Sequence, residues 1–164
     1  MTSLKIAVYP GSFDPITCGH LDIVKRSCKV FDKVIVAVLN NAAKHPLFTV
    51  SERIDLIKRC TEGLENCEVD SFDGLLMDFA RQKKADTVIR GLRAISDFEY
   101  EFQMALLNKK LNPKIETFFM VTSLNCLYIS SSVVKEICRY GGNTQGLIPN
   151  EIINDVKYKM EKEC

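Results

Sequence analysis

The chain lacks the features that most directly mark a protein that binds nucleic acid, crosses a membrane or is secreted. Its 22 Lys and Arg residues are balanced by 21 Asp and Glu residues, so a net charge of +1 provides no broad basic surface for nucleic acid or an anionic membrane. No apolar run approaches the ~20 residues of a membrane span, and Met1 to Val8 alternate polar and apolar residues, unlike a signal peptide. We therefore expect neither a nucleic-acid nor a membrane partner, and any anionic ligand must be held by a local cluster of cations.

Metal-binding and disulfide signatures are also missing. The seven cysteines are odd in number and include no C-x-x-C pair, and the chain has only two histidines. A structural zinc site and a disulfide framework are both disfavoured by this pattern. The cysteines are therefore expected to be free thiols in a reducing, cytoplasmic location.

The composition is that of a compact folded protein. Apolar residues make up 46% of the chain and charged residues 26%, which excludes disorder and fibrous repeats. A length of 164 residues is enough to bury about two-thirds of the surface that the unfolded chain exposes. Because no linker, repeat or low-complexity tract interrupts it, we predict a single domain over residues 1–164.

Strand-like and helix-like segments alternate along this domain. The unbroken apolar run at residues 34–39 is typical of a strand that is covered on both faces. Similar patterns predict strands near 4–8, 67–71, 87–89 and 116–121, with helices near 17–31, 49–60, 75–80, 98–111, 130–139 and 150–162. The alternation predicts an α/β fold with a doubly wound, Rossmann-like sheet of five parallel strands, helices on both faces and a C-terminal helix at about 150–162.

Ligands of such sheets bind beyond the carboxyl ends of the strands, so the loops after the strands are the places to look for a site. Neither the G-x-x-x-x-G-K-[ST] phosphate loop nor the G-x-G-x-x-G dinucleotide pattern occurs there. A kinase-type phosphate loop and an ordinary dinucleotide fold are therefore disfavoured.

The loop after the first strand carries Gly11 and Ser12 and leads into Thr17-Cys18-Gly19-His20 at the start of a helix. Gly19 permits close approach of a ligand to the backbone, and the N–H groups and positive dipole end of the helix would face an anion, with His20 as an imidazole donor. The alternative is a tight turn followed by a surface histidine. Cys18 at the same helix start is a weak candidate for a nucleophile.

Two further groups fall at the same sheet edge. The hydroxyl run Ser130-Ser131-Ser132 opens a helix after the last strand, whereas an ordinary helix cap needs only one serine. Lys44, Arg90 and Arg93 follow the second and fourth strands; each alone would suit a solvated surface, but together they suit phosphate oxygens. This convergence predicts a polyphosphate site, and because no acidic pair suggests a metal cage, Mg²⁺ is expected to arrive with the nucleotide.

At this point the motifs resemble a known family. Thr17-Cys18-Gly19-His20 and Ile129-Ser130-Ser131-Ser132 are similar to the paired signatures of the [HT]-x-G-H nucleotidyltransferase superfamily. The segments 9–15, 44–48 and above all 89–101 resemble bacterial phosphopantetheine adenylyltransferases, and the likeness runs from about Lys5 to Pro149.

The resemblance implies transfer of an adenylyl group from ATP to 4′-phosphopantetheine, with Mg²⁺, in a hexamer that coenzyme A can inhibit by feedback. It implies that His20, Lys44 and Arg93 are catalytic. It implies acceptor contacts from Ser12, Lys44, Leu76 and Arg90. It implies ATP contacts from Ser12, Phe13, His20, Gly91, Leu92, Arg93, Glu101, Cys126, Leu127, Tyr128, Ile129, Ser130, Ser131 and Ser132.

The sequence departs from the family pattern at a few positions. Ser12 stands where threonine is more usual, Cys126-Leu127 replace an aromatic residue and serine, and Ala43 and His45 flank Lys44 in place of serine and lysine. None of these removes a charge that the chemistry requires. Two alternatives stay open: transfer of an adenylyl or cytidylyl group to another phosphorylated acceptor, such as nicotinamide mononucleotide, and a noncatalytic module that senses ATP.

Overall fold

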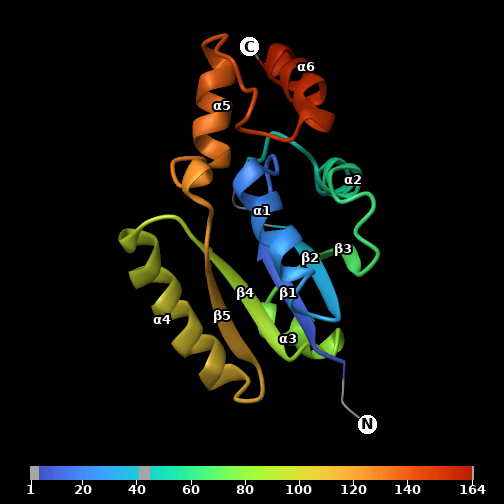
Figure 1. Ribbon diagram of the computed structural model, residues 1–164, viewed down its shortest axis with the longest axis vertical. Coiled ribbons are helices and arrows are strands. Elements are labelled where there is room, and N and C mark those ends of the chain that lie inside the picture. Colours follow the sequence, from blue (N-terminus) through green and yellow to red (C-terminus); the bar gives the residue numbers. More distant parts are fainter. Residues whose placement is uncertain (1–3, 41–44, 164) are drawn as a thin grey trace.

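The computed structural model describes residues 4–40 and 45–163, in which strands and helices alternate (Figure 1). The strands are β1 (Ile6–Gly11), β2 (Lys33–Leu39), β3 (Cys67–Phe72), β4 (Thr87–Leu92) and β5 (Glu116–Val121). The helices are α1 (Cys18–Ser27), α2 (Val50–Cys60), α3 (Leu76–Gln82), α4 (Ile95–Leu111), α5 (Ser131–Arg139) and α6 (Ile153–Glu163), with single-turn helices η1 (Leu124–Cys126) and η2 (Asn150–Ile152).

The five strands form one parallel sheet in the order β3-β2-β1-β4-β5. The chain therefore winds outward from β1 to β3, returns to the other side of β1 at β4 and winds outward again. This confirms the predicted doubly wound, Rossmann-like α/β fold and places its switch point between β1 and β4.

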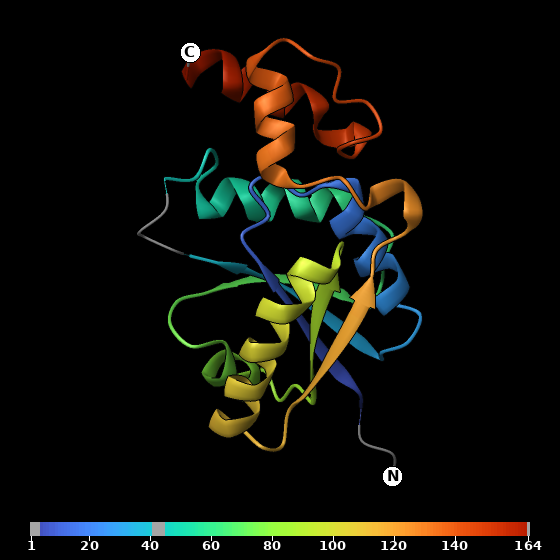
Figure 2. The same ribbon diagram turned by 90° about the vertical axis from the view of Figure 1, so that its left-hand side faces the viewer.

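Two apolar cores lie on the two faces of the sheet. One joins inward residues of β1 and β2 to α1 and α2, and extends to α5 and α6. The other joins the opposite faces of the same strands to α3. Figure 2 shows α1 and α3 on opposite sides of the strands, and both figures show α5 and α6 at the end of the molecule remote from the N-terminus.

The pairing of β1 with β4 is much shorter than the other pairings. The register joins only Ala7 with Thr87 and Val8 with Val88, although β1 continues to Gly11 and β4 to Leu92. The two strands therefore part toward their carboxyl ends. This divergence opens the space in which a ligand of a doubly wound sheet binds.

Local signals explain where two of the helices begin. Thr49 accepts a hydrogen bond from the backbone of Glu52, whose carboxylate accepts from the backbone of Thr49, and the pair forms a capping box. Thr17 caps α1 in the same way, with His20 in place of the usual glutamate.

Element boundaries differ from the predicted ones by a few residues. Helix α4 begins at Ile95 instead of 98, β4 extends to Leu92 instead of 89, and the C-terminal helix is split into η2 and α6. Within residues 4–40 and 45–163, no helix combines the length and apolar character needed to cross a bilayer.

Candidate active site

A cavity of about 620 Å³ lies where β1 and β4 part. Its volume falls in the range of about 300–1,000 Å³ that is usual for small-molecule sites. It is lined by the end of β1 with the following loop and α1, by the carboxyl ends of β2, β4 and β5, by residues 45–46 with α2, by α4, and by the start of α5. The predicted site residues in its lining are Ser12, Phe13, His20, Arg90, Gly91, Arg93, Glu101, Ile129, Ser130, Ser131 and Ser132.

The imidazole of His20 is fixed by the start of its own helix. The backbone N–H of Thr17 donates to Nδ1 of His20 over 3.1 Å, and the Thr17 hydroxyl lies 3.1 Å from the same atom. Because a backbone N–H can only donate, Nδ1 carries no proton and Nε2 keeps it. Burial, and secondarily the charge of Arg93, lower the pKa of His20 from 6.5 to about 4, so the ring is a neutral Nε2–H donor at physiological pH.

Phe13 supports His20 from the side. Its backbone adopts a left-handed conformation with φ of 47°, and its buried ring meets the ring of His20 edge-on at 5.1 Å and that of Tyr9 at 5.4 Å. The ring also folds back over Gly11, where an added Cβ would lie 2.9 Å from Cζ of Phe13. Phe13 therefore shapes the cavity wall by packing.

The three serines at the start of α5 have separate tasks. Ser130 is the N-cap residue and accepts from the backbone N–H of Val133 at 3.2 Å. Ser131 donates to the carbonyl of Pro15 at 2.8 Å, which joins α5 to the loop after β1. Ser132 is the remaining hydroxyl of the trio and also lines the cavity. Two of the three hydroxyls therefore also hold the fold together, in addition to their place in the cavity lining.

The N-terminus of α1 also forms hydrogen bonds within the protein. The N–H of Cys18 donates to the carbonyl of Leu147 at 2.9 Å, and the N–H of His20 donates to the Thr17 hydroxyl at 3.3 Å. These two N–H groups are thus bonded within the protein, which leaves the Gly19 backbone and the His20 ring, both in the cavity lining, as the contribution of α1 to anion binding.

The predicted arginines are paired with carboxylates beside the cavity. Arg90 donates through Nη2 to Glu101 at 2.6 Å and through Nε to its other oxygen, and Arg93 donates through Nε to Asp97 at 3.1 Å. The carboxylates come from α4, one turn apart. Helix α4 thereby holds both guanidinium groups near the end of β4.

Three charged residues of the cavity were not predicted as site residues. Arg53 of α2 is 2% exposed and donates to the carbonyls of Ser12 at 2.7 Å and Leu39 at 3.2 Å. Asp14, in the loop after β1, is buried and lies 2.8 Å from Nζ of Lys135. Arg53 and Asp14 were missed because their partners lie far away in sequence, but Lys135 follows the serine motif directly.

Five predicted residues lie outside the cavity lining. Cys126 is buried in the core beside α1, Tyr128 is 68% exposed, and Leu76 packs against the core on the α3 face. The other two are Leu92 and Leu127. Lys44 falls outside the described residues.

Neither a protein-held metal cluster nor an acidified Cys18 thiol is present among the described residues. No group of three or more His, Cys, Asp and Glu side chains in residues 4–40 and 45–163 is arranged to hold a metal ion. Burial raises the pKa of the Cys18 thiol, the opposite of the acidification that a nucleophile at a helix start would need.

Comparison with known proteins agrees with this geometry. Residues 8–137 match the cytidylyltransferase-like family. Phosphopantetheine adenylyltransferase of Clostridium beijerinckii is 58% identical over 96% of this chain and 99% of its own. The enzyme of the same name from Caldanaerobacter subterraneus is 54% identical over 97% of this chain and 99% of its own.

A solved structure supports the fold alone. A Vibrio parahaemolyticus protein provisionally named nicotinate-nucleotide adenylyltransferase superposes with a TM-score of 0.67 at 17% identity, over 96% of each chain. The family itself is set by the sequence relatives. The chain belongs to the phosphopantetheine adenylyltransferases, within the cytidylyltransferase-like family.

Proposed function

We propose that this protein transfers the adenylyl group of ATP to 4′-phosphopantetheine, giving dephospho-coenzyme A and pyrophosphate, the penultimate step of coenzyme A synthesis. The observation that carries the proposal is one cavity at the switch point that gathers His20, Arg90, Arg93 and the serine start of α5. The names of the close relatives point to the same reaction.

The chemistry needs no covalent intermediate. The phosphate of the acceptor is already a nucleophile, and the difficulty is to bring two anions together in line. The cavity lining holds four cationic side chains, Arg53, Arg90, Arg93 and Lys135, against the two carboxylates Asp14 and Glu101. This positive balance lowers the repulsion between the substrates while the overall charge of the protein stays near zero.

Each predicted group has a role in this scheme. Lys44 and Arg90 hold the phosphate of the acceptor, and Arg93 with the serine start of α5 holds the departing pyrophosphate. His20 donates its Nε2–H to an oxygen of the reacting phosphoryl group as negative charge builds up there. A neutral donor fits this role, because its proton stays on the ring throughout the transfer.

We propose that Mg²⁺ enters bound to the ATP phosphates. Both carboxylates of the cavity lining are already engaged, Asp14 by Lys135 and Glu101 by Arg90. Bound in this way, Mg²⁺ would shield the charge of the ATP phosphates, while the fixed cations Arg53, Arg90, Arg93 and Lys135 come from the protein.

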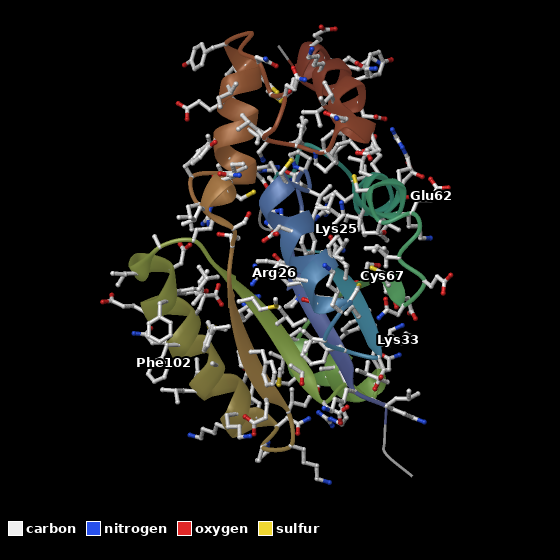
Figure 3. All side chains as sticks on the ribbon, viewed as in Figure 1. Lys25, Arg26, Lys33, Glu62, Cys67 and Phe102 are labelled. Carbon is white, nitrogen blue, oxygen red and sulfur yellow. The ribbon has the colours of Figure 1, made fainter. Side chains whose placement is uncertain are left out.

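We also propose that the protein assembles as a homo-oligomer, a hexamer by family resemblance. Apolar side chains are exposed along α4 and β5, and Phe102 projects away from the sheet (Figure 3). The exposed apolar residues on this side of the sheet, here called the α4–β5 face, include Phe98, Phe102, Leu106, Leu107, Leu111 and Val121. A helix and a strand that expose this many large apolar side chains are typical of an interface.

Two smaller proposals complete the account. Coenzyme A contains both the acceptor and the adenylate portions of the substrates, so it would compete for the cavity and act as a feedback inhibitor. The described cysteines 18, 28, 60, 67, 126 and 138 are free thiols, which is compatible with the proposed cytoplasmic location.

A pyrophosphate-release assay tests the proposed reaction. With ATP and Mg²⁺, release should require 4′-phosphopantetheine, and nicotinamide mononucleotide should not replace it. Turnover with the mononucleotide instead would favour the alternative acceptor. ATP binding without turnover on any phosphorylated acceptor would favour the noncatalytic nucleotide sensor.

A further inference from the structure

Asp14 connects three segments that are far apart in the sequence. Its Oδ2 accepts from the backbone N–H of Leu47 at 2.9 Å, and its Oδ1 accepts from that of Phe48 at 2.8 Å. The ammonium of Lys135 donates to Oδ2 at 2.8 Å. One carboxylate thus joins the loop after β1, the segment 45–48 that leads into α2, and helix α5.

These three segments are all walls of the same cavity. Asp14, His45, Pro46 and Lys135 belong to its lining, as do Ser12 beside Asp14 and the serines at the start of α5. Arg53 adds a second link between the same walls, because it reaches from α2 to the carbonyl of Ser12. The relative position of the walls therefore depends on a few buried polar contacts.

The side chain of Asp14 is only 8% exposed, so its charge needs a partner. Two backbone N–H groups alone would leave a negative charge in a cavity that attracts phosphates. The ammonium of Lys135, whose side chain is 28% exposed, neutralises that charge. The pair lets a carboxylate organise the loops without repelling an anionic substrate.

We propose that Asp14 is a positioning residue that fixes the segment 45–48 against the loop after β1, and that Lys135 is its counter-ion. This inference rests on the proposed function only for the identity of the anionic ligand. The two residues have separate tasks: Asp14 holds the backbone of Leu47 and Phe48, and Lys135 cancels the carboxylate charge.

The experiment compares the wild type with Asp14→Asn, Lys135→Met and the double variant in the full-length protein. Amide hydrogen exchange measures the protection of Leu47 and Phe48, and calorimetry measures ATP affinity without acceptor. An asparagine amide can accept from one of the two N–H groups but presents its own N–H to the other, so Asp14→Asn should reduce the protection of at least one of these amides about tenfold or more.

Lys135→Met should leave both amides protected but weaken ATP binding about tenfold, because it exposes the ligand to an uncompensated carboxylate. The double variant should bind ATP better than Lys135→Met alone, since it also removes that charge, while its amides stay as exposed to exchange as in Asp14→Asn. Lys135→Arg should restore the ATP affinity. A purely structural pair would give additive losses instead.

The proposal is overturned if Asp14→Asn leaves both amides protected, or if the double variant binds ATP no better than Lys135→Met. An Asp14→Asn protein that does not fold leaves the decision to Lys135→Met and Lys135→Arg: loss of amide protection in the methionine variant, or no recovery of ATP affinity in the arginine variant, also overturns it. These readouts need no turnover. A wild type that protects these amides and binds ATP but forms no dephospho-coenzyme A would refute the proposed reaction and leave the positioning role standing.

Discussion

The backbone N–H of Thr17 donates to Nδ1 of His20 across 3.1 Å. The same two residues therefore cap α1 and fix the orientation of the proposed catalytic imidazole. The capping box that ends α1 at its N-terminus also selects the tautomer with the proton on Nε2, and Phe13 packs against the ring at 5.1 Å. The ring therefore needs no reorientation when a ligand enters.

The neutrality of His20 predicts a specific loss of stability in acid. Its pKa in the folded state is about 4, against an ordinary value of 6.5, so between these values the unfolded chain binds the additional proton. Stability should fall as the pH decreases from about 6.5 toward 4, by up to about 3 kcal/mol from this group. Urea unfolding at pH 7 and pH 4.5 measures the loss, which should be smaller in His20→Asn. Equal losses in the two proteins would contradict a neutral His20 ring in the folded state.

Arg53 should contribute more to stability than a charged helix residue usually does, because its side chain is buried. Arg53→Met leaves the carbonyls of Ser12 and Leu39 without their buried donor, so we expect a loss of about 2–4 kcal/mol in unfolding free energy and a lower rate of turnover. Lys58→Met on the exposed side of α2 is the matched control, with a change within about 0.5 kcal/mol. Similar effects of the two substitutions in urea unfolding would refute the link from α2 to the loop after β1.

Gly91 is required because β4 passes close to α1. A Cβ at this position would lie 2.5 Å from Cδ1 of Ile23 and 3.3 Å from the hydroxyl of Tyr9. Gly91→Ala should therefore lower the unfolding free energy by about 1–3 kcal/mol. Ile23→Val removes the obstructing methyl group, so the double variant should be more stable than the sum of the single losses predicts. Strict additivity in urea unfolding would contradict this packing.

The α4–β5 face should mediate self-association. Sedimentation velocity on the wild type should give a species larger than the 18.6 kDa chain. Phe102→Glu should shift it toward the monomer, because burial of an unpaired carboxylate at an apolar interface is costly. Tyr158→Glu, at an exposed aromatic residue of α6, is the control and should leave the assembly unchanged. A monomeric wild type, or dissociation only in the control, would refute the assignment of this face.

Much of the fold follows from local patterns in the sequence. The apolar run that became β2 and the alternation of strands and helices correctly predicted a doubly wound parallel sheet. Its carboxyl edge then indicated where His20, Arg90, Arg93 and the serines would meet. These features could be predicted from the sequence because each strand, helix or loop pattern involves only a few neighbouring residues.

The remaining features depend on contacts across the fold. Arg53 and Ser12 are separated by 41 positions, and Asp14 and Lys135 by 121, so no local pattern shows that either pair meets. The same reason explains the serines: Ser131 is committed to the carbonyl of Pro15, which lies 116 positions away. The residues that link the walls of the cavity were therefore harder to predict than the residues that belong to a recognisable sequence motif.

The most direct test concerns the claim that this cavity catalyses adenylyl transfer with His20 as a donor to the transition state. It measures the single-turnover rate and the ATP affinity of the same His20→Ala protein. We expect the rate to fall by about 10²–10³, while the dissociation constant for ATP changes less than about threefold, because the His20 contact strengthens only as charge develops. An unchanged rate from bound substrates, with ATP affinity lost, would contradict it.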